Sequence, residues 1–123
     1  MKLHLSNPSG VNSITAHGDG YVEINQRRYT SSLVVMPQTL YVEGWAELGF
    51  EQLSEAHFAR LAEFKPEMVL LGTGSKLRFP HPRLSRALAE ARIGLDVMDT
   101  GAACRTYNIL MAEGRNVLAL LLL

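Results

Sequence analysis

Two stretches of the sequence place hydroxyl, carboxyl, thiol, guanidinium and amide groups beside glycines. The first, Gly72 to Ser75, directly follows an apolar run, and the second extends from Asp99 to Asn108. Glycines let backbone N–H groups approach an anion, an arginine binds phosphate or carboxylate, and a cysteine can act as a nucleophile. The candidate ligand- or partner-binding residues are Gly72, Thr73, Gly74, Ser75, Asp99, Thr100, Cys104, Arg105 and Asn108.

The sequence Gly-Thr-Gly-Ser at 72–75 has only a superficial likeness to phosphate-binding loops. Neither Gly-x-x-x-x-Gly-Lys-Ser/Thr nor Gly-x-Gly-x-x-Gly is present, and the next helix is predicted about eight residues later. A structural turn is therefore the favoured interpretation, with an anion-binding loop as the alternative.

Asp99 to Arg105 combines a capping residue, small residues and a cation at a predicted helix start. Either Asp99 or Thr100 can cap the free N–H groups. An arginine in a first turn opposes the helix dipole, so Arg105 needs a partner, either Asp99 or an external anion. An internal contact with Asp99 is favoured.

Cys104 has two opposed interpretations, an activated thiol or a packed apolar side chain. With Thr100 as the cap, Cys104 is the fourth helical residue, where the helix terminus and Arg105 favour thiolate. Asn108 would lie on the same helix face, directed toward the sulfur or the 72–75 loop. We expect instead a packed, slow-reacting thiol, with Cys104→Ser costing on the order of 1 to 3 kcal/mol if the hydroxyl finds no partner.

No complete set of acid, base and nucleophile, and no metal-ligand spacing, is recognisable in the sequence. The four histidines are scattered, with surface or turn roles favoured. Trp45, between two glycines, is predicted to be a core residue, with an exposed partner anchor as the alternative. We therefore expect no metal and no cofactor, and a protein without enzymatic activity is favoured over an enzyme.

Composition limits the remaining possibilities. A chain of 123 residues with 47% hydrophobic content predicts a single domain over 1–123. Twelve basic and twelve acidic residues give no net charge, so nucleic acid is not an expected partner. One cysteine fits a reducing compartment, and no signal peptide or apolar run of bilayer length is present. We expect a soluble, cytoplasmic, not membrane-spanning protein.

Residue patterning predicts a β-rich first part followed by a βαβαβ unit. Residues 1–44, including Leu3 and Leu5, show period-two and turn signals typical of four or five short antiparallel strands. Turns are expected at 18–20 and 25–27. After them we predict a helix over 55–64 capped by Ser54, a strand from Met68, a helix over 82–91 stopped by Gly94, a strand over 93–97, a helix over 102–113 and a strand over 117–122.

These elements predict a mixed sheet in which parallel strands alternate with helices. Loops at the carboxyl ends of neighbouring parallel strands face one crevice, so the 72–75 loop and the stretch from Asp99 should meet there.

The chain also resembles the family of mitochondrial complex I assembly factor 3 and the adipogenesis-associated Mth-type domain protein, which has small bacterial members of unknown function. The resemblance rests on Leu71-Gly72-Thr73-Gly74, Asp99-Thr100, Ala103-Cys104 and Thr106-Tyr107-Asn108 and covers nearly the whole chain. It implies a three-layer α/β/α sandwich, a protein partner and no established reaction. The stretch from Asp99 to Leu110 is similar to the bacterial form of the motif.

Two functional hypotheses follow. The first is a non-enzymatic interaction domain, an assembly or accessory factor for a larger respiratory or membrane complex, present as a monomer or weak homodimer. The second is a small-molecule or anion-binding protein, or an enzyme, that uses the crevice between 72–75 and 99–105, with Arg105, Lys76 or Arg78 as the cation.

Overall fold

The computed structural model describes residues 10–123, so the strand expected around Leu3 and Leu5 lies outside the described residues. The elements in chain order are β1 (Ile14–Gly18), β2 (Tyr21–Ile24), β3 (Arg27–Tyr29), β4 (Leu33–Val35), β5 (Leu40–Tyr41), η1 (Phe50–Gln52), α1 (Glu55–Glu63), β6 (Met68–Gly72), η2 (Pro82–Ser85), α2 (Arg86–Glu90), β7 (Gly94–Met98), α3 (Thr100–Ala112) and β8 (Val117–Leu121).

A five-stranded mixed sheet with the order β5-β4-β8-β6-β7 forms the centre of the molecule. β6 lies parallel to both β7 and β8, while β4 pairs antiparallel with β8 and with β5. The predicted βαβαβ unit is therefore present. Strand β8 is buried along its whole length and the last four residues of β6 are buried too, which is why both strands are continuous apolar runs.

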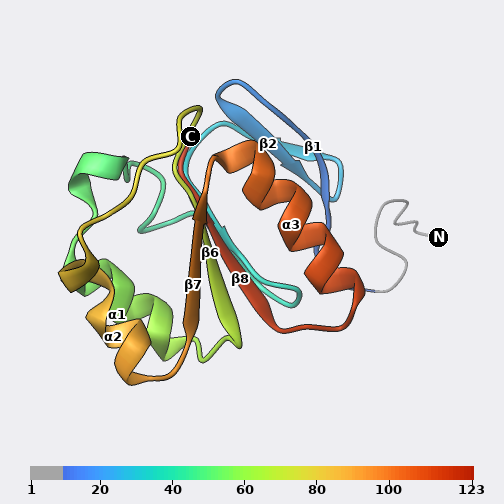
Figure 1. Ribbon diagram of the computed structural model, residues 1–123. Coiled ribbons are helices and arrows are strands. Elements are labelled where there is room, and N and C mark those ends of the chain that lie inside the picture. Colours follow the sequence, from blue (N-terminus) through green and yellow to red (C-terminus); the bar gives the residue numbers. More distant parts are fainter. Residues whose placement is uncertain (1–9) are drawn as a thin grey trace.

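Helices cover both faces of this sheet (Figure 1). α1 and α2 pack on one face, over a core that includes Phe58, Leu61 and Leu88. α3 packs on the other face, where Ala103, Cys104 and Tyr107 meet Leu70 and Ala119. The predicted three-layer α/β/α architecture is confirmed.

The β-rich first part divides between two sheets. β1, β2 and β3 form a separate three-stranded antiparallel sheet, whereas β4 and β5 join the central sheet. The small sheet lies beside α3 (Figure 1), and its Ile14, Val22 and Ile24 share the core of that face. The β2–β3 turn at Asn25 and Gln26, with φ of 55° and 69°, reverses the chain as expected.

Three helix boundaries differ from the sequence prediction. Asp99, one of the two predicted caps, is the N-cap of α3, because its side chain accepts a hydrogen bond from the Ala102 N–H at 2.9 Å; the helix therefore begins at Thr100 and not at 102. The helix expected over 82–91 is a 3-10 turn followed by the short α2, which ends at Glu90. Gly94 is therefore the first residue of β7, not the residue that stops the helix.

The start of α1 agrees with the prediction. Ser54 caps the helix, and its hydroxyl accepts from the His57 N–H at 3.4 Å, while the Ser54 N–H donates to the His57 Nδ1 at 3.1 Å. Within residues 10–123, no helix has both the length and the apolar character needed to cross a bilayer.

Candidate functional site

The loops after β6 and β7 meet at the carboxyl end of the parallel strands, as the topology predicts. The Thr73 N–H donates to the Met98 carbonyl at 2.9 Å, and the Thr100 N–H donates to the Gly74 carbonyl at 2.9 Å. The Gly74 N–H in turn donates to the Thr100 Oγ1 at 2.8 Å. These three bonds hold the loop after β6 against the start of α3.

Gly72 allows this close approach because it has no side chain. A Cβ added there would lie 3.0 Å from the Thr100 Cα and 3.2 Å from the Ala103 Cβ. Since carbon atoms rarely approach so closely, any other residue at 72 would push α3 away from β6. Gly72 is thus a packing residue beneath the crevice.

The hydroxyls of Thr73 and Thr100 point into the protein. Thr73 Oγ1 donates to the Lys76 carbonyl at 2.6 Å and accepts from the Arg78 N–H at 3.2 Å. Thr100 Oγ1 donates to the Leu122 carbonyl at 2.7 Å. Thr73 is 1% exposed and Thr100 is 7% exposed. Both hydroxyls are committed to internal hydrogen bonds, so neither is presented to a ligand.

An open hollow of about 510 Å³ lies over the meeting point of the two loops. It is lined by His17, Gly18, Asp19, Gly20, Gly74, Ser75, Asp99, Thr100, Gly101, Leu122 and Leu123. Asp19 and Asp99 contribute carboxylates to the lining of this hollow, and none of its lining residues within 10–123 is a lysine or an arginine. The charge of this hollow therefore disfavours an anion.

The β1–β2 turn at 18–20 forms one wall of the hollow, and sequence analysis did not place it there. The Gly-Asp-Gly sequence predicts a turn, but a local pattern carries no information about which distant loop that turn faces. Only the packing of β1 on α3 brings the turn beside Asp99 and Thr100.

The last three candidate residues lie away from this hollow. Cys104, Arg105 and Asn108 line a separate groove of about 330 Å³ together with residues 14–17 of β1. The predicted single crevice therefore contains Gly74, Ser75, Asp99 and Thr100 but not these three residues. The reason is helical geometry, since each additional turn of α3 carries its side chains further from the strand ends.

Cys104 is packed, with 1% of its surface exposed. Burial raises the pKa of its thiol to about 12, against a smaller opposing effect of the Arg105 charge. Because Asp99 is the cap, Cys104 is the fifth helical residue and lies beyond the free N–H groups. The thiol is therefore held in its neutral form at physiological pH.

Asn108 binds the small sheet, not the sulfur or the 72–75 loop as expected. Its Nδ2 donates to the Ile14 carbonyl at 2.7 Å, and its Oδ1 accepts from the Ile14 N–H at 2.9 Å. The Asn108 amide therefore pairs with the backbone of Ile14 as a residue of a neighbouring strand would. The neighbouring Tyr107 hydroxyl donates to the Asn12 carbonyl at 2.9 Å, so α3 holds the small sheet at several points.

Arg105 is exposed and does not form the expected ion pair with Asp99. The ion pairs among residues 10–123 are Arg28–Glu23 at 3.4 Å, Arg78–Glu51 at 2.7 Å and Arg115–Glu67 at 2.8 Å. With Thr100 as the first helical residue, Arg105 lies in the second turn, where the helix dipole opposes a cation only weakly.

Two further residues discussed from sequence have structural roles. Trp45 is 1% exposed, which confirms the core prediction, and the Arg60 guanidinium lies 4.3 Å from its ring centroid. Burial and the Arg60 charge lower the pKa of His57, whose ring is 5.9 Å from that of Trp45. Within the described part of the chain, no group of three or more His, Cys, Asp or Glu side chains could hold a metal ion.

Comparison with known proteins identifies the family. The family described as "Protein of unknown function (DUF498/DUF598)" matches residues 14–122. The chain belongs to the DUF498/DUF598 family. This DUF498/DUF598 chain is 36% identical over 84 residues to "NADH dehydrogenase [ubiquinone] 1 alpha subcomplex assembly factor 3" of Mus musculus, an alignment that covers 67% of the chain and 44% of the mouse protein.

Two bacterial proteins are also similar to this DUF498/DUF598 chain. The "13 kDa major membrane protein" of Francisella tularensis is 34% identical over 67 residues, covering 54% of each chain. A crystal structure of a Bordetella parapertussis protein superposes with a TM-score of 0.85 at 37% identity, covering 94% of this chain and 98% of that one. The chain spans about half the length of the curated relatives it matches.

Proposed function

We propose that this DUF498/DUF598 protein is a non-enzymatic interaction domain that assists the assembly of a larger respiratory or membrane complex. The observation that carries the proposal is the 36% identity, over two thirds of the chain, to a protein named as a complex I assembly factor. That relative is named as an assembly factor and not for a reaction, and the same kind of role is proposed here.

The chemistry of the crevice supports a non-catalytic role. A nucleophile needs a base within hydrogen-bond reach, and the crevice hydroxyls of Thr73 and Thr100 instead bind backbone groups. Asp99 accepts from the Ala102 N–H as a helix cap, and the Cys104 thiol is neutral and buried. The residues that resemble catalytic groups are therefore used for folding.

The test is affinity capture of the full chain after mild cross-linking in its native cells. We expect a reproducible protein partner that is retained by a Glu63→Arg variant, since Glu63 lies on the exposed side of α1. An Asp19→Arg variant reports whether the partner contacts the hollow. Recovery of no partner, together with a measured turnover on a metabolite, would overturn the proposal.

A small-molecule binder is the second candidate, favoured by the open hollow of about 510 Å³. A thermal-shift screen with nucleotides, phosphorylated metabolites and dicarboxylates tests it, with stabilisation on the order of 1 to 3 kcal/mol expected at saturation. Arg105 lines the separate groove with Cys104 and Asn108, so loss of the response in an Arg105→Ala variant would assign an anion to that groove and not to the hollow. Equal responses of both proteins would reject a role for Arg105.

We place the protein in the cytoplasm as a monomer or weak homodimer. A single packed cysteine suits a reducing compartment, where no disulfide is required. Light scattering of the purified chain over a range of concentrations and fractionation of its native cells test these two assignments.

A further inference from the structure

One segment concentrates positive charge in a chain that has none overall. Residues 75–89 contain Lys76, Arg78, Arg83 and Arg86 and no acidic residue, whereas the whole chain has twelve basic and twelve acidic residues. The segment includes the loop after β6 and continues through η2 into α2. This segment of the sequence therefore has an excess of positive charge, although Glu51, Glu55 and Glu90 from outside it lie near Arg78, Arg83 and Arg86.

The same loop exposes two large apolar side chains. Leu77 is 52% exposed and Phe79 is 70% exposed, the latter being the most exposed large apolar residue in the described chain. They alternate with Lys76 and Arg78. Exposing such groups together is unfavourable in water, so their arrangement calls for a surface that receives them.

The base of the loop is held by hydrogen bonds and an ion pair to neighbouring residues. Thr73 Oγ1 holds the Lys76 carbonyl at 2.6 Å and the Arg78 N–H at 3.2 Å. The Arg78 guanidinium forms an ion pair with Glu51 at 2.7 Å and lies 4.5 Å from the Phe50 ring centroid. The loop is thus presented in one conformation before it meets a partner.

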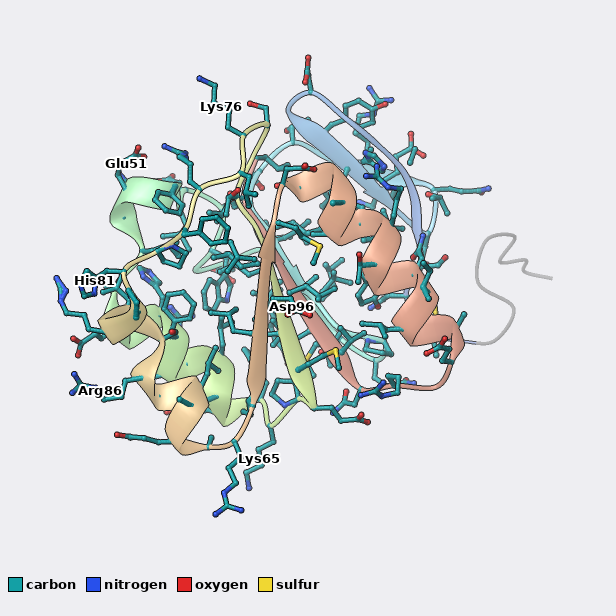
Figure 2. The ribbon with its side chains drawn as sticks, viewed as in Figure 1. Glu51, Lys65, Lys76, His81, Arg86 and Asp96 are labelled. Carbon is teal, nitrogen blue, oxygen red and sulfur yellow. The ribbon has the colours of Figure 1, made fainter. Side chains whose placement is uncertain are left out.

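The remaining cations of the segment are free to act on an external surface. Lys76, Arg83 and Arg86 take part in none of the ion pairs of residues 10–123. Glu55 and Glu90 share a groove with Arg83 and Arg86 but are not within 4.0 Å of them as ion pairs. Figure 2 shows the side chains of Lys76, His81 and Arg86 extending outward, away from the central sheet.

We propose that the loop formed by residues 76–79, together with Arg83 and Arg86, binds the surface of an anionic lipid bilayer. Leu77 and Phe79 would enter the boundary between headgroups and acyl chains, while the three unpaired cations stay at the level of the lipid phosphates. Both apolar side chains are more than half exposed, and a bilayer interface offers an apolar layer beneath an anionic one without a preformed pocket.

This inference does not rest on the proposed assembly role. A protein that binds no partner could still bind vesicles, and an assembly factor could act without touching lipid. Vesicle binding of the purified chain tests the membrane proposal alone, and affinity capture of a protein partner tests the assembly proposal alone, so one can be rejected without the other.

The experiment is co-sedimentation of the purified full chain with vesicles of phosphatidylcholine alone and with about 30% phosphatidylserine. We expect about tenfold or stronger binding to the anionic vesicles. A Leu77→Ser/Phe79→Ser variant and a Lys76→Glu/Arg83→Glu/Arg86→Glu variant should each lose most of it. Ile109→Ser is the matched control, because Ile109 is 60% exposed on α3, away from this segment.

Several outcomes would overturn the proposal once circular dichroism has shown each variant to be folded. The first is equal binding to both kinds of vesicle. The second is wild-type binding by the Leu77→Ser/Phe79→Ser variant, because the protein would then adsorb through its charges without inserting apolar side chains. Absence of vesicle binding, with a molecular mass that falls on Phe79→Ser substitution, would make the loop a self-association surface instead.

Discussion

Replacing Thr100 by valine tests whether the crevice is held together by one buried hydroxyl. Valine has nearly the same shape and helix propensity as threonine, so the substitution removes little except the oxygen. In the folded protein that oxygen accepts from the Gly74 N–H at 2.8 Å and donates to the Leu122 carbonyl at 2.7 Å. Both backbone groups would lose their partner in a site where Thr100 is 7% exposed.

An unsatisfied buried donor or acceptor costs about 1 to 3 kcal/mol, and the hydrophobic gain of a methyl group offsets part of this cost. We therefore expect Thr100→Val to lower the free energy of unfolding by roughly 2 to 4 kcal/mol, measured by urea denaturation with an unchanged m-value. The protein should remain folded, with the loop after β6 more open to hydrogen exchange.

Thr106→Val is the matched control, because Thr106 is on the same helix, is partly exposed, and makes no side-chain hydrogen bond within the described structure. Its unfolding free energy should change by less than about 0.5 kcal/mol. If Thr100→Val and Thr106→Val destabilise the protein equally, the hydroxyl of Thr100 does not join the loops and the reasoning is refuted.

Three further predictions follow from other contacts. Asn108→Ala should cost about 2 to 3 kcal/mol and speed hydrogen exchange at Ile14, because both backbone groups of Ile14 bind the amide. The pKa of His57 is lowered in the folded protein, so the unfolded chain binds this proton more tightly and the free energy of unfolding should fall as pH drops below about 6.5. A His57→Gln variant, whose side chain can still accept from the Ser54 N–H, should show a weaker dependence of stability on pH, measured by urea denaturation. The pKa of the Cys104 thiol is raised from an ordinary 9.0 to about 12, so the free energy of unfolding should fall as pH rises above about 9. Iodoacetamide should label the native protein at pH 7 far more slowly than it labels a free thiol, and rapid labelling would contradict a buried, neutral Cys104.

The order of the elements in the carboxyl-terminal part could be predicted because its signals are local. An apolar run ended by a glycine defines β6, alternation ending at Asp99 defines β7, and apolar spacing defines α3. Parallel pairing of β6 with its neighbours then follows from the handedness of crossover connections. The meeting of the loops after β6 and β7 is a consequence of that topology.

The division of the amino-terminal strands could not be predicted, because it depends on distant partners. β4 joins the central sheet since Leu33, Val34 and Val35 pair with residues 119–121 of β8. β1 to β3 lack such a partner and pack against α3 instead. Period-two patterning indicates that a strand exists but does not state which sheet it joins.

The same limit explains why the candidate residues are divided between two places in the structure. The chemistry and sequence positions of the nine candidate residues predict one crevice, but α3 runs along the face of the sheet as it leaves Asp99. Cys104 and Asn108 therefore lie on the side that faces β1, where the amide completes the backbone bonding of Ile14. The competing demand was the need of the small sheet for hydrogen-bond partners, which sequence patterning does not display.

The residues that carry the family resemblance have roles in folding. Their presence therefore indicates that the chain has this fold and does not indicate what the protein does. Gly72 admits α3 to β6, Thr73 and Thr100 join the two loops, Asp99 caps the helix, and Asn108 holds the small sheet. A motif made of such residues specifies how this three-layer domain closes and says little about its partner. The exposed side chains next to the motif, on the loop after β6 and on the β1–β2 turn, make no such folding contacts and are where the proposed partner binding is to be tested. Substitutions at these exposed positions should therefore change partner or vesicle binding without unfolding the domain, whereas substitutions in the motif should first lower its stability.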